Sequence, residues 1–225
     1  MPKVSVVIPT MNEERTIGET LDEVRRHLAG SDFEILIVDT SSRDRTREIA
    51  VSKGAVVVDE PRRGYGRAYK TGFERARGEF IVTLDADNTY PAGDIPRLLG
   101  IVERGEADFA SGDRISTMDR GSMSAMHRIG NGLLNLTVLA LFHRRVRDTQ
   151  SGMWAFRRGL LGKIEPKSDG MPFSEEIKLE VVRKGLRLVE VPINYRPRKG
   201  ESKLRSWEDG WKNFRHLFRL RFSGR

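Results

Sequence analysis

Residues 3–14 read KVSVVIPTMNEE, an apolar run with three valines and an isoleucine that ends in polar residues. Such β-branched runs, bounded by turn residues, are typical of buried strands. Three similar runs follow, at residues 34–38, 55–58 and 80–84. Between them, residues 14–28, 44–53 and 66–76 have helical patterns. This alternation predicts an α/β fold with a mostly parallel, Rossmann-like central sheet flanked by helices.

The second part of the chain departs from this regular alternation. We expect strands at residues 108–112, 154–157 and 188–193, and helices at residues 124–142, at residues 175–184 and from residue 206 onward. No internal repeat, linker or low-complexity tract interrupts the chain. Because 225 residues are enough to bury one full core, we predict a single domain.

The composition excludes several kinds of site. The chain has no cysteine, which excludes thiol catalysis, zinc–thiolate sites and disulfide frameworks and agrees with a reducing compartment. The longest mainly apolar stretch, residues 129–142, is shorter than the roughly 20 residues that span a bilayer, and no signal-peptide pattern follows Met1. The net charge of +8 indicates an anionic partner. We therefore expect a cytoplasmic protein that does not cross a membrane.

Polar residues follow each of the first four predicted strands, at residues 10–14, 39–44, 60–66 and 85–88. In parallel sheets ligands bind beyond the carboxyl ends of the strands. Asp85 and Asp87 come directly after the run FIVTL, with one residue between them. Hard ions such as Mg²⁺ and Mn²⁺ take oxygen ligands and leave room for substrate phosphates, so this pair is a candidate site for a metal and a diphosphate. The alternative for an isolated Asp-x-Asp is a helix N-cap followed by a turn.

Four motifs in order resemble family 2 glycosyltransferases. VVIPTMNEE (residues 6–14) is similar to the family's VxIPxxNE, and IVDTSSRDRT (37–46) to its VDDxSxDxT. RGYGRA (63–68) resembles the NxGxxxA loop, and LDAD (84–87) the metal motif. The resemblance implies a glycosyltransferase A (GT-A) fold over residues 1–225. It implies a nucleotide-sugar-binding half at 1–105, an acceptor-binding half at 106–205 and a C-terminal amphipathic basic helix at 206–225.

Within that family, nearly the whole chain resembles the dolichol-phosphate mannose and glucose synthases. The resemblance rests on GDR at 112–114, Arg128 with Asn131, DTQSG at 148–152, Glu175-Glu176, and YRPRKGESKL at 195–204. It implies that the donor nucleotide is held by Pro9, Thr10, Asn12, Glu13, Asp39, Ser41, Gly64, Gly66, Asp85 and Ala86. It implies that Asp85 and Asp87 hold Mg²⁺ or Mn²⁺, and that catalysis involves Asp87, Arg114, Arg128, Asp148, Ser151, Arg198 and Lys203.

Two positions depart from the family pattern. Thr40 stands where a second Asp usually follows the second strand, which leaves Asp39 as the carboxylate for the base. The Gln that commonly follows the metal motif by two positions in the mannose synthases is absent from the sequence Asn88-Thr89-Tyr90-Pro91.

The expected reaction is metal-dependent, inverting transfer of a hexose from GDP-mannose, UDP-glucose or UDP-N-acetylglucosamine to a polyprenyl (dolichyl) phosphate. A phosphate monoester has a second pKa near 6, so such an acceptor is largely ionised at neutral pH and needs no strong base. The alternative is a family 2 enzyme that uses a hydroxyl acceptor with Asp148 as base. If the acceptor is a polyprenyl phosphate, Asp148 is instead the orienting partner of an arginine.

Two other classes are weaker alternatives. The basic C-terminal segment lacks the motifs of nucleic-acid-binding proteins, so we expect no nucleic-acid partner. A nucleotidyltransferase would also use paired acids, and would release pyrophosphate instead of a nucleoside diphosphate.

The last predicted helix has the pattern of a membrane-surface helix. Trp207, Trp211, Phe214 and Phe218 share one helical face, and Lys212, Arg215, Arg219 and Arg221 lie largely off it. We expect this helix to lie on the cytoplasmic face of a membrane; the alternative is a terminal helix packed on the core. The helix at 124–142 is a candidate for a second interfacial element, for core burial or for dimer contact. The sequence leaves the oligomeric state open.

Overall fold

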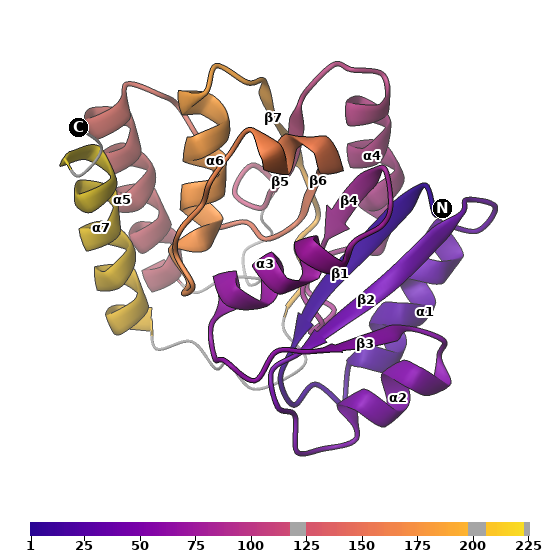
Figure 1. Ribbon diagram of the computed structural model, residues 1–225. Coiled ribbons are helices and arrows are strands. Elements are labelled where there is room, and N and C mark those ends of the chain that lie inside the picture. The colour runs from indigo at the N-terminus through magenta and orange to yellow at the C-terminus, as the bar shows by residue number, and fades with distance from the viewer. Residues whose placement is uncertain (118–124, 198–205, 223–225) are drawn as a thin grey trace.

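The computed structural model describes residues 1–117, 125–197 and 206–222, with the side chains of 125–128 and 206–209 outside the description (Figure 1). The described strands form one seven-stranded sheet in the order β3-β2-β1-β4-β6-β5-β7. The strands are β1 (Val4–Thr10), β2 (Phe33–Asp39), β3 (Val56–Asp59), β4 (Phe80–Thr83), β5 (Phe109–Asp113), β6 (Trp154–Arg157) and β7 (Leu188–Pro192). All seven predicted strands are confirmed to within two residues at each end.

One strand runs against the others. β6 pairs antiparallel with both β4 and β5, whereas the remaining neighbours pair in parallel. The prediction of a mostly parallel sheet is therefore confirmed. The reversal also places the amino end of β6 at the edge where the other strands have their carboxyl ends.

The helices are α1 (Ile17–His27), α2 (Thr46–Ser52), α3 (Tyr65–Arg75), α4 (Ile95–Glu103), α5 (Ala125–Phe142), α6 (Phe173–Arg183) and α7 (Ser206–Phe222). Two short 3₁₀ helices, η1 (Ala92–Asp94) and η2 (Arg158–Gly162), complete the chain. The helices α4, η1 and η2 were not predicted from the sequence. The first two lie between the metal motif and β5, where Pro91, Pro96 and Gly100 interrupt the apolar pattern.

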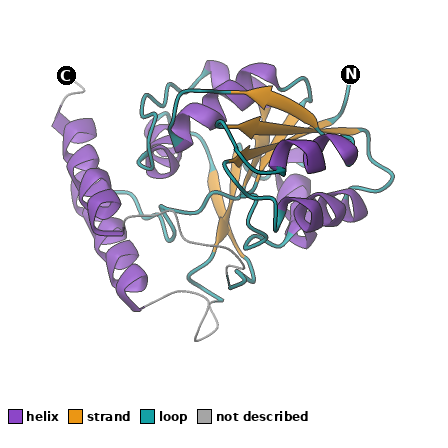
Figure 2. Ribbon diagram, turned by 90° about the horizontal axis from the view of Figure 1, so that it is seen from below, coloured by secondary structure: helices purple, strands orange, loops and turns teal. Residues whose placement is uncertain are grey.

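Helices cover both faces of the sheet. Successive strand side chains point to opposite faces: Val6 and Ile8 pack with α1, α2 and α4, whereas Val7 packs with α3 and α6. Figures 1 and 2 show α5 and α7 side by side at one end of the molecule. A smaller cluster, which includes Leu134, Leu179 and Leu217, joins these two helices to α6.

Glycine at position 72 allows α3 to lie close to the sheet. A Cβ atom there would lie 2.4 Å from Val7 Cγ1 and 2.9 Å from Val38 Cγ2. We predict that Gly72→Ala lowers the free energy of unfolding by about 1–3 kcal/mol through overpacking. Urea unfolding monitored by circular dichroism measures this.

The matched control is Gly132→Ala in α5, where nothing lies within 4 Å of the added Cβ. The higher helix propensity of alanine should stabilise that variant by about 0.5–1 kcal/mol. Equal effects of the two substitutions would contradict the close approach of α3 to the sheet.

Candidate active site

The polar segments that follow the strands meet at one edge of the sheet. The carboxyl ends of β1, β2 and β4 lie side by side there, next to the amino end of β6. Three residues just past these strands, Asn12, Ser41 and Asn88, have positive φ angles of 53°, 57° and 61°. Non-glycine residues seldom adopt this left-handed conformation, and such residues cluster at functional sites. The edge is therefore the candidate site.

Hydrogen bonds tie the loops after β1 and β2 together. The Asn12 amide N–H donates to Ser42 Oγ, and Asn12 Oδ1 accepts from the Arg43 amide, both at 2.8 Å. The Glu13 amide donates to Thr46 Oγ1, also at 2.8 Å. These bonds bring five of the predicted donor residues, Pro9, Thr10, Asn12, Glu13 and Ser41, to one surface.

The buried carboxylate of Asp39 holds the same two loops in place. Its carboxylate is 1% exposed and accepts hydrogen bonds from the Ser42 amide (3.0 Å), Thr10 Oγ1 (3.2 Å) and Arg47 Nη1 (3.1 Å). Thr40, which replaces the family's second Asp, is also buried. Asp39 is thus a fixed acceptor at the base of the loop pair.

The two carboxylates of the Asp-x-Asp motif have different surroundings, as their one-residue spacing predicts. Asp87 is 3% exposed, and its Oδ1 accepts from the amide (3.1 Å) and the hydroxyl (2.6 Å) of Thr89. Asp85 is half-buried, and its Oδ1 accepts from the hydroxyls of Tyr65 (3.3 Å) and Tyr69 (3.5 Å). Burial, and then the charge of Asp85, raise the pKa of both tyrosines well above the usual value, so they remain donors.

This donor set fits a divalent ion that is shared with a diphosphate. Mg²⁺ is usually held by one or two carboxylates together with waters and substrate phosphates. Asp85 and Asp87 supply such a pair, whereas the described residues contain no group of three or more Asp, Glu, His or Cys side chains arranged as a metal site. Asn88, the residue after the motif, has its Oδ1 bonded to Arg196 Nη1 at 3.2 Å.

Arg114 and Asp148 form a buried ion pair between the end of β5 and the loop before β6. Arg114 Nε and Nη2 each donate to the carboxylate at 2.8 Å, and the Arg114 amide donates at 2.9 Å. Asp148 is fully buried and Arg114 is 8% exposed. Burial by itself raises the pKa of Asp148, but the charge and hydrogen bonds of Arg114 outweigh it and hold the pKa below the usual range. Asp148 is therefore a poor proton acceptor.

A buried lysine supports this pair from α6. Lys178 Nζ donates to the Asp148 carbonyl oxygen at 2.6 Å, and burial lowers the pKa of Lys178 to about 8. Glu190 on β7 accepts from the amides of Arg147 (2.7 Å) and Asp148 (2.9 Å). Arg114 at the end of β5, Lys178 of α6 and Glu190 of β7 thus fix the position of Asp148.

Comparison with known proteins agrees with this geometry. Residues 5–165 match the family described as Glycosyl transferase family 2. This chain belongs to glycosyltransferase family 2. A Haloferax volcanii "Low-salt glycan biosynthesis hexosyltransferase Agl6" is 40% identical over 220 residues, which cover 96% of this chain and 53% of that protein. The chain thus spans about half the length of that relative.

Two further relatives carry lipid-phosphate names. The "Dolichyl-phosphate hexose transferase" of Haloferax volcanii is 37% identical over 92% of this chain and 89% of that protein. The "Dolichol-phosphate mannosyltransferase" of Pyrococcus furiosus is 32% identical over 97% of this chain and 63% of that protein. Among solved structures, glucosyl-3-phosphoglycerate synthase of Mycobacterium tuberculosis superposes with a TM-score of 0.81 at 23% identity, over 99% of this chain and 80% of that chain. The predicted GT-A fold is confirmed.

Within this family 2 site, Gly64 and Gly66 also have a packing role. A Cβ at Gly64 would lie 2.3 Å from the Asp169 carbonyl oxygen, and one at Gly66 would lie 2.5 Å from that of Ser168. Gly64 has φ 153°, within the region that favours glycine. Both glycines therefore let the start of α3 pack against residues 168–173, whatever they contribute to donor binding.

The remaining predicted residues fall into two groups. Ser151 is fully buried, with its Oγ unpartnered among the described residues, and Ala86 is buried with its carbonyl bonded to Thr20 Oγ1 at 3.2 Å. The side chain of Arg128 lies outside the described residues, as do Arg198 and Lys203 entirely. Their roles remain predictions.

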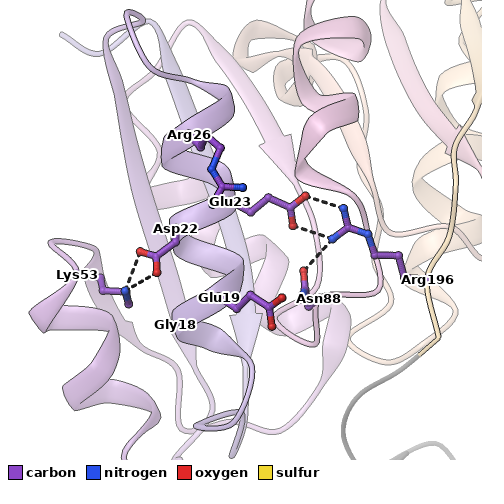
Figure 3. A pocket seen from close by; sticks show the side chains of 8 residues that line it. All are labelled: Gly18, Glu19, Asp22, Glu23, Arg26, Lys53, Asn88 and Arg196. Atoms are coloured by element: carbon purple, nitrogen blue, oxygen red, sulfur yellow. Dashed lines mark hydrogen bonds and ion pairs between the residues drawn. The ribbon is translucent and has the colours of Figure 1, made fainter.

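Sequence reasoning missed a clamp behind the metal motif. Arg196 donates to both carboxylate oxygens of Glu23 at 2.7 and 2.8 Å, as well as to Asn88 Oδ1, and its amide donates to the Thr89 carbonyl at 2.9 Å (Figure 3). The neighbouring Tyr195 ring packs edge-on against Tyr90 at 5.2 Å, and the Arg114 guanidinium lies 5.3 Å from its centre. No local signal marks Glu23, because a polar residue within a helix is ordinary.

The clamp borders a cavity of about 630 Å³, whose opposite wall carries a second ion pair between Asp22 and Lys53 at 2.6 Å (Figure 3). The Asp22–Lys53 pair is a control for the Glu23–Arg196 pair, since it does not contact residues 87–90 after the Asp-x-Asp motif.

The buried ion pair allows a direct test of stability. We predict that Asp148→Asn lowers the free energy of unfolding by about 3–5 kcal/mol, because Arg114 remains buried without its counter-charge. Since the pKa of Asp148 is lowered on folding, the pair stabilises the wild type above the ordinary aspartate pKa of 3.8, and this stability is lost as the pH falls through the folded-state pKa.

Urea unfolding at neutral and acidic pH measures both effects. The control is Glu106→Gln, which breaks the exposed Arg104–Glu106 pair and should leave the unfolding midpoint unchanged. A neutral-pH loss for Asp148→Asn no larger than that of the control would contradict the prediction.

A second prediction concerns the clamp. Glu23→Gln should accelerate amide hydrogen exchange in residues 87–90 about fivefold, the factor that corresponds to about 1 kcal/mol for a hydrogen bond. Asp22→Asn, in the same helix and cavity, should leave exchange in this segment unchanged. Mass spectrometry of peptides that cover the turn compares the two variants, and equal exchange would show that Glu23 does not hold it.

Proposed function

We propose that this family 2 chain transfers a hexose, with inversion, from a nucleotide sugar to a polyprenyl phosphate. The observation that carries the proposal is the buried Arg114–Asp148 pair at the same sheet edge as Asp85 and Asp87. Asp148 uses Nε and Nη2 of the guanidinium, and no described residue bonds to Nη1. Arginine is suited to phosphate because its donors are fixed in a planar fork.

The state of Asp148 favours a phosphate acceptor over a hydroxyl acceptor. A hydroxyl nucleophile needs a base, and a carboxylate with a lowered pKa in an ion pair is a weak one. A lipid monophosphate is already largely ionised at neutral pH. Two relatives, a dolichyl-phosphate hexose transferase and a dolichol-phosphate mannosyltransferase, also support a phosphate acceptor. Asp148 thus orients Arg114, and Arg114 binds the acceptor phosphate.

We assign the donor to the β1, β2 and β4 side of the edge. Pro9, Thr10, Asn12, Glu13, Asp39 and Ser41 would contact the nucleoside, and Asp85 and Asp87 would hold Mg²⁺ or Mn²⁺ with the diphosphate. Solved complexes of glucosyl-3-phosphoglycerate synthase contain Mn²⁺ with UDP or UDP-glucose. When bound, the ion would neutralise charge on the departing nucleoside diphosphate.

The transfer itself is one displacement. An oxygen of the acceptor phosphate forms a bond to the anomeric carbon of the sugar, while the bond from that carbon to the diphosphate oxygen breaks. The nucleoside diphosphate leaves with the electron pair, and the anomeric configuration inverts. Arg114, Arg128, Ser151, Arg198 and Lys203 are the residues proposed to bring the two anionic groups together.

We also propose that α5 and α7 contact a membrane on its cytoplasmic face. Ile129, Leu133 and Leu136 on α5 are 56–70% exposed, and Trp211, Phe218 and Phe222 are exposed on α7. No described residue buries this α5 stripe, which favours contact with a membrane. None of the described helices combines the length and apolarity needed to cross a bilayer. Peripheral contact through exposed aromatic and aliphatic side chains fits both observations.

The test is a panel of nucleotide sugars with Mg²⁺ or Mn²⁺, with and without dolichyl phosphate, that measures nucleoside diphosphate release and labelled lipid. We expect lipid-dependent release with one donor. Asp87→Ala should lower this rate at least about a hundredfold by removing charge stabilisation in the transition state. Asp32→Ala, in an exposed loop, is the control and should keep full activity.

Other outcomes of this assay would support a different function. Release that is indifferent to lipid would favour the hydroxyl acceptor, and pyrophosphate release would indicate a nucleotidyltransferase. Full activity of Asp87→Ala would overturn the metal site.

A further inference from the structure

A second cavity, of about 420 Å³, lies between α7 and the turn that leads into α6. Its α7 wall consists of Trp211, Lys212, Arg215, His216 and Arg219. The opposite wall consists of Ser168, Gly170, Met171 and Pro172, together with Gly64 and Tyr65 at the start of α3. Among the residues that line it, Gly64 was a predicted donor-binding residue, and the others were not among the predicted site residues.

The charge of this cavity is strongly positive. Lys212, Arg215 and Arg219 lie on one side of α7 at spacings of three and four residues, where helical side chains are neighbours. No ion pair among the described residues includes Arg215 or Arg219. A single kind of charge concentrated in a concave site selects an anionic ligand.

Glu176, the carboxylate behind this wall, forms no ion pair with Arg215 or Arg219 among the described residues. Glu176 is 1% exposed, and its two oxygens accept hydrogen bonds from the amides of Lys167 (2.9 Å) and Ser168 (2.7 Å). One of them also lies 3.3 Å from His216 Nε2. Both carboxylate oxygens of Glu176 therefore already have partners within the fold.

The remaining surfaces of the cavity are apolar. Met171 and Pro172 line the side opposite α7, and Trp211 is 60% exposed. The Trp211 ring stacks on Phe214 at 5.7 Å, and a row of ring contacts continues to Phe218 and Phe222. Tryptophan beside basic residues is typical of the boundary between lipid and water. The ligand should thus combine an anionic group with an apolar chain.

The cavity also adjoins the candidate active site. Tyr65 lines it, and the Tyr65 hydroxyl donates to Asp85 Oδ1 at 3.3 Å. One side chain therefore separates this basic cavity from the carboxylate proposed to hold the metal.

We infer that this cavity binds the phosphate head group of a lipid, with Arg215 and Arg219 as its phosphate contacts and Trp211 against the lipid chain. Two sources share this chemistry, an anionic membrane phospholipid and the polyprenyl phosphate acceptor. The second source rests on the proposed function, whereas the first does not.

Vesicle flotation tests the inference without requiring transfer. The full chain is mixed with vesicles of phosphatidylcholine alone, with added phosphatidylglycerol, or with added dolichyl phosphate. Arg215→Ala and Arg219→Ala should each weaken binding to at least one anionic vesicle about tenfold or more, as expected for a charge-assisted hydrogen bond of about 1.5–3 kcal/mol.

The matched control is Arg221→Ala. Arg221 is an exposed arginine of the same helix that does not line the cavity. It should weaken binding at most about fivefold, the factor that corresponds to about 1 kcal/mol for one basic residue near an anionic surface. Unfolding midpoints of all three variants should match the wild type, because the three side chains are exposed.

The pattern of losses identifies the source or refutes the site. A selective loss on phosphatidylglycerol vesicles identifies a phospholipid, and one on dolichyl phosphate vesicles identifies the acceptor; losses on both support a general lipid-phosphate site. Equal losses for the three variants, or no loss, would overturn the inference and leave α7 with a diffuse basic face. Because binding is measured directly, failure of sugar transfer would not affect this result.

Discussion

The buried ion pair between Arg114 and Asp148 is the interaction on which the arrangement of β5, β7, α6 and the loop before β6 depends. Two charges inside a protein are tolerated only when their geometry and additional hydrogen bonds offset the cost of desolvation. Here Lys178 from α6 and Glu190 from β7 bond to the backbone of the loop that carries Asp148. The pair therefore requires that β5, β7, α6 and the loop before β6 are all in place, and it fixes the position of Arg114, to which we assign the acceptor phosphate.

The loops after β1, β2 and β4 are held by a different set of interactions. These loops leave the strands through left-handed residues, Asn12, Ser41 and Asn88, and the loops after β1 and β2 are hydrogen-bonded to each other. Such conformations persist only where the surrounding structure over-determines them. The Arg196 clamp connects the two halves, since it joins the turn after the metal motif to α1 and continues from Tyr195, which contacts Arg114.

The two outer helices, α5 and α7, are connected to the loop that carries Asp148. Asn135 of α5 accepts from Thr149 Oγ1 at 2.9 Å, and Asn213 of α7 donates to Gln150 Oε1 at 2.9 Å. Gln150 in turn donates to the buried Glu175 at 2.9 Å. Asn135 and Asn213 thus join α5 and α7, the two helices that we propose contact a membrane, to the loop between Asp148 and Ser151.

The sequence by itself determined the seven strands, most of the helices and the carboxylate pair that follows β4. Strand and helix periodicities are local, so FIVTL followed by Asp85 and Asp87 was sufficient to predict a carboxylate pair at the end of a strand in a mostly parallel sheet. Only the tertiary structure decided the direction of β6, the partner of Asp148 and the Glu23–Arg196 clamp, whose members are 173 positions apart. The physical reason is that a charged residue has the same local pattern whether it faces water or a distant counter-charge, and packing alone selects between them.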